Sequence, residues 1–395
     1  MERQRVQLVD SLRGFSLFGI LLANLLIFQY GMFGKDQISF YNLSDFNFGS
    51  YKFIQVFVEG TFMPIFTFLF GYSLIKLVES LRDKGRKSRW FLVRRFLMLI
   101  TLGLLHSTFI WEGDILTFYG GIGFFLFFFI NRKPKTLIIW GIVLLVLISA
   151  TGYGKYEEAE KEKNITASYV EKTTPIYKNG NYLEIKDHRN NGVDPMTAMY
   201  DEDPLSSFFI ILLLPFIMAP LFLFGMAAAK LNIFAKPKEE RKSYFKYMLI
   251  FIPLGLILKI VGHLAEKSDW ASIGVMGGGP ILALGYMAAF AYLFSSHSQA
   301  LPFRAFESVG KLSLTNYIMQ SVICTTIFYG YGLGLFGNFG TFNSILLGFF
   351  IFATQCFMST MYLKKFKRGP LELLLRIVTN FSWNGRVKIK SKAVS

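Results

Sequence analysis

A histidine and two carboxylates occur together in a stretch of the chain that is otherwise apolar. His106, Glu112 and Asp114 lie in the segment GLLHSTFIWEGDILTFYGG, residues 103–121. An imidazole beside a carboxylate can act as a general base, because the carboxylate orients the ring and stabilises its cation. We predict that His106 is such a base. Asp114 precedes a helical pattern, where Asp typically caps the helix N-terminus, so we assign it a structural role and expect Glu112 to be solvated.

Glu59 is the predicted partner of His106. His106 lies five residues before Trp111, which ends one apolar run, and Glu59 lies seven residues after Lys52, which begins another. At about 1.5 Å per residue, both side chains are expected at a similar depth in a membrane. The alternative is a neutral His106 that only bonds a neighbouring helix, since a histidine in a membrane span usually faces the protein interior.

A second group of polar residues is expected at the opposite side of the membrane. Asp10 and Arg13 are three residues apart and therefore share a helical face, with Asn24 deeper on the same helix. Arg94 and Arg95 are expected at the same level, and arginine binds phosphates well. These five residues are predicted to bind the substrate or cofactor. The alternative is that the charges only anchor the chain at the headgroups.

A polar stripe follows in the segment GKLSLTNYIMQS, where Ser313, Asn316 and Gln320 recur at helical spacing. We include Asn316 and Gln320 among the binding residues, while hydrogen bonding between helices is the alternative. Cys324 and Cys356 both lie in apolar runs, so neither a disulfide nor a metal site is predicted. No nucleotide-binding or metalloprotease motif is present, and no covalently bound cofactor is expected.

The elements that hold these residues are expected to be membrane helices. The 395 residues are 53% hydrophobic and only 17% charged, with a mean hydropathy of +0.41. Runs of about 20 apolar residues match the thickness of the hydrocarbon core. The predicted fold is an all-α, polytopic membrane helix bundle with about ten spans. These spans are 9–31, 52–77, 91–111, 115–131, 136–153, 205–229, 245–264, 272–295, 309–331 and 341–363.

The charges between the spans predict the orientation. The net charge of +16 is concentrated beside span ends, as in RDKGRKSRWFLVRR with seven basic residues and one acid. This pattern indicates cytoplasmic loops and lipid headgroups rather than nucleic acid. Residues 154–204 instead contain eleven acids and seven basic residues. We therefore predict a multi-pass protein of the cell membrane with both termini in the cytoplasm.

Four regions follow from this topology. Five spans in 1–153 form a first membrane bundle, and five spans in 205–363 form a second. The extracytoplasmic loop 154–204 lies between them, with a polar helical or disordered start and turn-rich residues that could form a small hairpin. The basic cytoplasmic tail 364–395 contains the amphipathic pattern PLELLLRIVTN, which is expected to lie along the headgroups.

Five motifs show a resemblance. VDSLRGFSLFGILLAN, FTFLFGYS, GLLHSTFIWEGDIL, GKLSLTNYIMQS and GPLELLLR, in this order, resemble the YeiB-like membrane proteins, a family defined by a domain of unknown function. The first motif also resembles the opening helix of the transmembrane acyltransferase superfamily, which includes the lysosomal heparan glucosaminide acetyltransferases. That resemblance implies acyl transfer from cytoplasmic acetyl-CoA to a sugar on the far side, with Asp10, Arg13 and Asn24 matching the Asp-x-x-Arg-Gly…Asn pattern.

The same resemblance places the working histidine of the heparan enzymes between the first two spans. Residues 33–51 of this chain contain no histidine, so His106 would have to act from another helix.

Two functions are therefore expected. The first is a membrane acyltransferase that moves an acyl group from a cytoplasmic acyl-CoA to a hydroxyl or amine of an envelope glycan or lipid at the outer face. The second is a transporter or lipid-handling protein in which Glu59 and His106 relay protons. A structural partner in an envelope assembly is a third alternative. Membrane lipids are the expected surroundings, and the sequence leaves a homodimer open.

Overall fold

The computed structural model describes residues 6–154, 160–200, 216, 219–265 and 268–383. All regular secondary structure in the described part is helical. Its first half contains α1 (Gln7–Tyr30), η1 (Ile38–Tyr41), α2 (Asp45–Phe57), α3 (Phe62–Asp83), α4 (Ser88–Phe109), α5 (Leu116–Leu126), α6 (Pro134–Ala150), α7 (Glu160–Asn179), α8 (Tyr182–Asn191) and α9 (Pro195–Tyr200). Its second half contains the helix Ala219–Lys230, α11 (Arg241–Leu264), α12 (Ala271–His297), α13 (Leu301–Lys311), α14 (Ser313–Phe328), α15 (Thr341–Lys365) and α16 (Pro370–Asn380).

The protein is an integral membrane helix bundle, as predicted. Six helical segments in the described part are long and apolar enough to cross a membrane: Gln7–Tyr30, Asp45–Asp83, Ser88–Phe109, Arg241–Leu264, Ala271–His297 and Thr341–Lys365. Shorter apolar helices at Leu116–Leu126, Pro134–Ala150 and Ala219–Lys230 overlap three further predicted spans. Most of the predicted span 205–229 lies outside the described residues.

α1 lies at the centre of the bundle. It packs against α3, α13, α14 and α15, so the segments before and after the large loop contribute to one hydrophobic core. The outer helices instead expose large apolar side chains, such as Ile257 on α11 and Phe350 on α15. In a membrane, this exposed apolar surface faces lipid and needs no protein partner.

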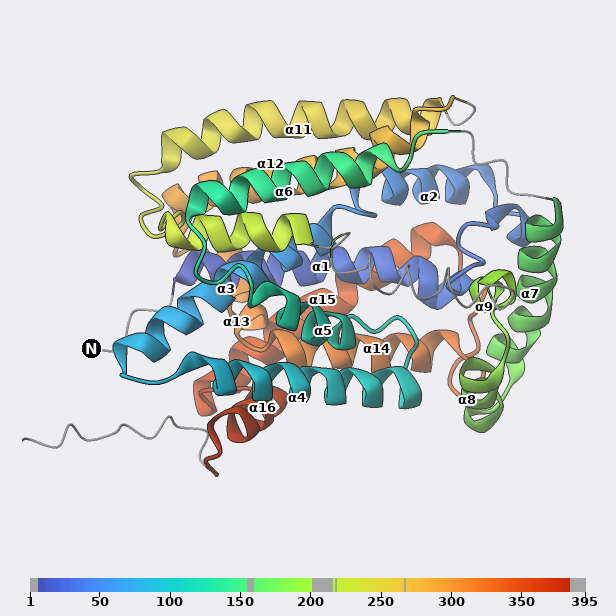
Figure 1. Cartoon of the computed structure of the whole chain (residues 1–395). Helices are drawn as coiled ribbons and strands as arrows, with labels where there is room; N and C mark the ends of the chain where they lie inside the picture. The colour runs from blue at the N-terminus through green and yellow to red at the C-terminus, as the bar shows by residue number, and fades with distance from the viewer. Residues whose placement is uncertain (1–5, 155–159, 201–215, 217–218, 266–267, 384–395) are drawn as a thin grey trace, which may run out of the picture.

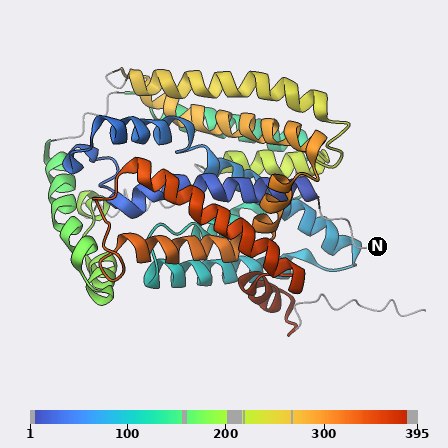
Figure 2. The same ribbon diagram turned by 180° about the vertical axis from the view of Figure 1, so that it is seen from behind.

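The long helices run side by side between two ends of the bundle (Figure 1). One end is covered by α7, α8 and α9 and is called the α8 end. The other end holds the N-terminus of α1 and the helix α16, and is called the α16 end. The view from behind shows the same separation of α7 and α8 from α16 (Figure 2).

The described residues of the segment 154–204 are largely helical, which was one of the two predicted alternatives for its start. Its described residues form three helices, and Asn181 begins α8 with a capping box in which the Asn181 side chain accepts from the backbone of Leu183 and Glu184. The small hairpin predicted from the turn residues is therefore wrong. Asn and Gly also occur at helix ends, and here Gly180 and Asn181 separate α7 from α8.

Three of the predicted spans do not correspond to one continuous helix in the structure. The span 52–77 is interrupted between α2 and α3 at residues 58–61, where Gly60 has a φ of +66°. The span 309–331 is bent at Leu312, between α13 and α14, and α13 occupies most of the predicted loop 296–308. α5 ends at Leu126 because the next residues form tighter i to i+3 turns, such as Phe129 N to Leu126 O at 3.0 Å.

Candidate functional site

A histidine–carboxylate pair lies at the α8 end of the bundle. His106 Nδ1 and Asp114 Oδ1 are 2.9 Å apart, and the two side chains are only 1% and 2% exposed. With its neutral ring protonated on Nδ1, His106 donates to the carboxylate and leaves Nε2 as the basic atom. Nε2 is buried and has no hydrogen-bond partner among the described residues. A carboxylate-oriented imidazole with a free Nε2 is the arrangement of a general base.

Two local features fix this pair. Asp114 Oδ2 accepts from the Thr117 backbone N–H at 2.8 Å, so the cap predicted for Asp114 is present at the start of α5. Gly103 permits the close approach of α4, since a Cβ there would lie 2.4 Å from Asp114 Oδ2 and 2.3 Å from Thr117 N. Asp114 therefore has two roles, because one oxygen caps the helix and the other orients His106.

Tyr317 of α14 holds the turn between α4 and α5. Its hydroxyl donates to the Gly113 carbonyl at 3.1 Å and accepts from the Ile115 backbone N–H at 3.2 Å. The Tyr317 ring lies beside that of His106, with centroids 5.3 Å apart. Sequence analysis did not identify Tyr317, although it belongs to the motif that contains Asn316.

Glu112 lies next to the pair and is not solvated as predicted. Its Oε1 accepts from the Tyr177 hydroxyl of α7 at 3.0 Å, while Oε2 is buried and has no hydrogen-bond partner. Burial raises the pKa of Glu112, although Arg189 and Tyr177 partly oppose that effect. Burial also acts to raise the pKa of Asp114, but the bonds from His106 and Thr117 outweigh it and lower that pKa.

Helix α8 covers this site by binding the carbonyl groups at the end of α4. Arg189 donates to the carbonyls of Ile110 at 2.9 Å and Thr108 at 2.7 Å, and the Tyr182 hydroxyl donates to that of Phe109 at 2.8 Å. These carbonyls have no partner within their own helix. An open cavity of about 470 Å³ remains here, lined by Ser107, Thr108, Glu112, Arg189 and Asn190.

Buried polar atoms without a partner gather around Glu112. Besides His106 Nε2 and Glu112 Oε2, they include Trp111 Nε1, Arg189 Nε and the Tyr329 hydroxyl. Glu112 is within electrostatic reach of His106, Arg189 and Tyr329. Buried polar groups in proteins are almost always hydrogen-bonded. Such a concentration is expected where water or a polar ligand completes the site.

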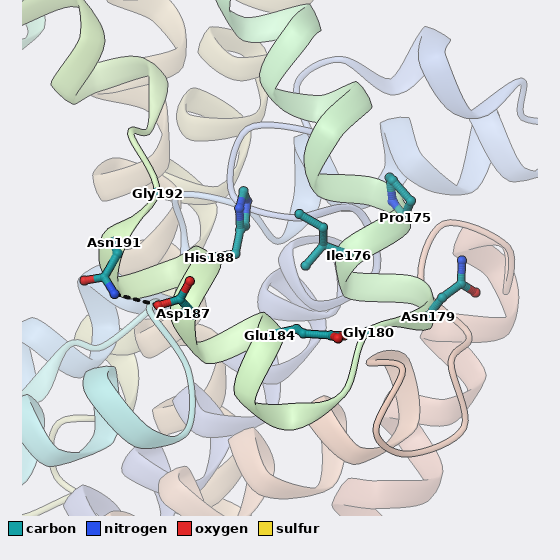
Figure 3. A pocket seen from close by; sticks show the side chains of 9 residues that line it. All are labelled: Pro175, Ile176, Asn179, Gly180, Glu184, Asp187, His188, Asn191 and Gly192. Carbon is teal, nitrogen blue, oxygen red and sulfur yellow. Dashed lines mark hydrogen bonds between the residues drawn. The ribbon is translucent and has the colours of Figure 1, made fainter.

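A second cavity lies between α7 and α8, with a volume of about 670 Å³ (Figure 3). Its polar side chains are mostly engaged within the two helices. Asn191 donates to Asp187 at 2.7 Å, the Asn181 N–H donates to Glu184 at 2.9 Å, and His188 bonds Thr173 at 3.0 Å. None of the described residues that line this cavity has a buried polar side-chain atom without a partner, in contrast to those around Glu112.

The structure does not pair Glu59 with His106. Glu59 lies in the turn between α2 and α3, and its carboxylate accepts from Lys35 at 2.8 Å. The prediction used only the depth of the two residues in the membrane. Depth does not determine the direction in which each side chain points from its helix. The orienting role assigned to Glu59 belongs to Asp114 instead.

Lys259 is a buried cation that sequence analysis missed. It lies on α11, is 1% exposed, and donates to the Glu59 carbonyl at 2.6 Å and to the Thr61 hydroxyl at 3.3 Å. It thus satisfies backbone freed by the interruption between α2 and α3. The signal available in the sequence was a lysine in the middle of an apolar run.

At the α16 end, Asp10 and Arg13 form the predicted pair. Arg13 Nη1 lies 2.7 Å from Asp10 Oδ1, and Nη2 donates to Ser73 at 2.8 Å. Arg94 is not directed at the Asp10–Arg13 pair. Its Nε instead donates to the Thr379 carbonyl of α16 at 3.0 Å. Asn24 is half-buried on α1, and its side chain makes no hydrogen bond within the described part of the chain.

Arg95 is half-buried on α4 and lies within electrostatic reach of Arg13 and Arg376. The structure thus brings Arg95 toward Arg13, as expected, and adds an arginine from α16.

Asn316 and Gln320 join α14 to α15. Asn316 donates to Ser359 at 3.0 Å, and Gln320 donates to Gln355 at 2.9 Å. Both side chains are buried. Their engagement supports the alternative of interhelical hydrogen bonding over substrate binding. In the described residues, no three His, Cys, Asp or Glu side chains are grouped to hold a metal ion.

The fold and this site define a polytopic membrane protein with a covered histidine–carboxylate pair at one end of its bundle. Residues 228–382 match the family described as "Protein of unknown function (DUF418)". The "Uncharacterized protein YxaH" of Bacillus subtilis (strain 168) is 31% identical over 395 residues, which cover 97% of this chain and 96% of that protein. The chain therefore belongs to the YeiB-like, DUF418 family.

Two further relatives match over nearly their whole length. The "Uncharacterized protein YeiB" of Escherichia coli (strain K12) is 24% identical over 392 residues, covering 94% of this chain and 95% of that protein. The "Uncharacterized 39.9 kDa protein in amylase 3'region" of Bacillus acidopullulyticus is 25% identical over 396 residues, covering 95% and 94%.

Proposed function

We propose that this protein is a membrane acyltransferase that uses an acyl-CoA donor. The observation that supports it best is the His106–Asp114 pair, in which His106 Nε2 is buried, oriented and without a partner in the described part of the chain. The acceptor is a hydroxyl or amine of an envelope glycan or lipid. We place the protein in the cell membrane, with both termini in the cytoplasm and the α8 end outside.

The reaction assigns one step to each residue. His106 Nε2 takes the proton of the acceptor as its oxygen or nitrogen attacks the thioester carbonyl. The carbon–sulfur bond breaks, and the CoA thiolate leaves and takes up a proton from the imidazolium or water. Asp114 stabilises the imidazolium while it exists. The products are the acylated acceptor and CoA, and no oxidant or metal ion is required.

The test is acyl transfer by the purified protein, measured as CoA release from acetyl-CoA with an envelope extract as acceptor. We expect His106→Ala to lower the rate by at least about a hundredfold, the usual contribution of a general base. Asp114→Asn should lose activity as well, because the amide neither stabilises the imidazolium nor fixes its tautomer.

The controls separate catalysis from folding. Glu59→Gln should retain most activity, since Glu59 pairs with Lys35. Equal melting temperatures for wild type and the His106 variant would show an intact fold. Wild-type activity in His106→Ala would refute the assignment of the base.

A transporter is the second candidate, and the interruption between α2 and α3 favours it. Discontinuous helices that expose backbone carbonyls form the binding sites of many transporters. Here Lys259 and Lys35 both bind groups of Glu59 at the break. Absence of CoA release from wild type, together with proteoliposome uptake that depends on Glu59 and Lys259, would establish this candidate over the first.

A further inference from the structure

Arg95 is a cation without a compensating carboxylate. Its side chain is half-buried on α4, and in the described part of the chain no acidic residue forms an ion pair with it. The charges that act on it are those of Arg376 and Arg13, which repel it. Holding a guanidinium away from water beside like charges is unfavourable unless an anion joins them.

The neighbouring arginines differ in their engagement. Asp10 and Ser73 already bind Arg13 at 2.7 and 2.8 Å. Arg94 binds the last turn of α16 through the Thr379 carbonyl and lies over the Phe381 ring, 5.0 Å from its centroid. Arg95 is the residue of this group that has no such bond among the described residues.

Helix α16 packs against α4, the helix that holds Arg95, and Arg376 lies within electrostatic reach of Arg95. Near its start, Glu372 accepts from the backbone of Leu314 and Thr315 at 2.8 and 3.0 Å, and so caps α14. At its end, Arg94 binds Thr379. α16 is therefore docked on α4 and α14 by the Glu372 carboxylate and the Thr379 carbonyl, and Leu375 is buried, whereas Leu373 and Leu374 are exposed. Arg376 lies on the helix between the two attachments.

We propose that Arg95, Arg13 and Arg376 form a binding site for a phosphate group at the α16 end of the bundle. Arg13 is paired with Asp10, so the three guanidinium groups exceed the carboxylates paired with them among the described residues, and this excess favours a multiply charged anion over a neutral ligand. Arginine suits phosphate because its parallel N–H groups bind two oxygens at once.

The inference rests on the proposed function for its choice of ligand, which is the phosphate-bearing donor acyl-CoA. Arg95 and His106 are eleven residues apart on α4, or about 16 Å at 1.5 Å per residue. The donor's phosphates would bind at one end of this helix and its acyl group would react at the other. The phosphate of an anionic lipid headgroup offers the same chemistry from a second source.

The experiment measures binding to the purified full-length protein in a non-ionic detergent by isothermal titration calorimetry. The probes are CoA, inorganic phosphate and mixed micelles that contain phosphatidylglycerol. We expect CoA to bind, and Arg95→Gln and Arg376→Gln each to weaken its binding by about tenfold or more, as for loss of a charged hydrogen bond. The matched control is Arg132→Gln, which removes one positive charge from an exposed turn.

Stability provides a second readout. An arginine that only supports the fold would lower the melting temperature of the ligand-free protein when replaced. Arg95→Gln should leave it unchanged or raise it, because the variant removes repulsion from two arginines. A lower melting temperature with undiminished CoA affinity would overturn the proposal.

The remaining outcomes are distinct. Phosphatidylglycerol binding that depends on Arg95, without CoA binding, supports the site and identifies a lipid phosphate as its ligand. Wild type that binds none of the three probes overturns it. If CoA binds through Arg95 but no acyl transfer occurs, the proposed function fails and the site stands. If transfer occurs at an acetyl-CoA KM unchanged in Arg95→Gln, the site fails and the function stands.

Discussion

Two carboxylates at the turn after α4 have pKa values shifted in opposite directions. Asp114 receives hydrogen bonds from His106 and Thr117, which lower its pKa despite burial. Glu112, two residues away, is buried with one oxygen unbonded, and its pKa is raised. Paired groups with separated pKa values are typical of acid and base roles in one site. In this pair, Asp114 remains ionised beside the base, and Glu112 accepts a proton more readily.

The raised pKa of Glu112 predicts how stability depends on pH. A buried carboxyl whose folded pKa exceeds its ordinary value of 4.5 destabilises the folded protein as pH rises through the folded pKa. Glu112→Gln removes this charge and keeps an acceptor for Tyr177. We expect its melting temperature to exceed that of wild type at pH 8, with a smaller difference at pH 4.5.

The control for that measurement is Glu184→Gln, because Glu184 is exposed and binds only the Asn181 backbone. A Glu112→Gln gain that stays the same at both pH values would show that the charge of Glu112 is not its cause.

At the scale of single residues, the types of the residues predicted where the site lies better than they predicted which residues contact one another. The conjunction of His106, Glu112 and Asp114 identified the turn, and the Asp114 cap is present. The prediction that Glu59 is the partner of His106 was wrong, because the depth of a residue along a helix does not determine the direction of its side chain around the helix axis. Lys259 and Tyr317 were missed because their partners, Glu59 and Gly113, are distant in sequence and lie on other helices.

At the scale of elements, the interruption between α2 and α3 is the feature that hydropathy alone did not predict. Residues 56–66 are apolar except for Glu59, Gly60 and Thr61. Gly60 adopts a positive φ, which favours glycine, and Gly279 of α12 packs directly against its carbonyl. A Glu-Gly pair within an apolar run was therefore the available signal. Unpaired backbone in a membrane needs protein partners, and Lys259 is one of them.

Lys259→Met tests this support. The methionine preserves the length of the side chain but leaves the Glu59 carbonyl and Thr61 hydroxyl without their donor. We expect the free energy of unfolding to fall by about 1 to 3 kcal/mol, as for a buried acceptor left unbonded. Denaturation of the detergent-solubilised protein by sodium dodecyl sulfate measures the change.

Lys246→Met is the matched control, since Lys246 lies exposed on the same helix. If both variants lose the same stability, the bond from Lys259 to the interrupted segment has no special role.

For the whole molecule, the sequence predicted the class of fold because lipid imposes simple constraints. Long apolar runs form helices, and the alternating charge of the well-charged connecting segments remains a prediction of orientation. Composition could not predict which helices pack against one another, such as the packing of α1 against α13, α14 and α15. Such contacts depend on side-chain shape rather than hydropathy. The docking of α16 through Glu372 and Arg94 was not predicted, because the amphipathic pattern of this segment indicated only a helix that lies along the headgroups.

The last prediction concerns the orientation of the whole molecule. The exposed residues Asn179, near α8, and Arg132, between α5 and α6, belong to segments of opposite charge balance and opposite predicted location. Cys324 is buried and Cys356 half-buried, so both are first replaced by alanine to remove background. In that protein, a membrane-impermeant maleimide should label Asn179→Cys in intact cells. Arg132→Cys should react only after the cells are permeabilised, because the positive-inside rule retains its loop in the cytoplasm. Labelling of both positions in intact cells would contradict this topology, and labelling of Arg132→Cys alone would invert it. In the inverted case, the arginines at the α16 end would face away from cytoplasmic CoA, and the acyl-CoA donor would have to be abandoned.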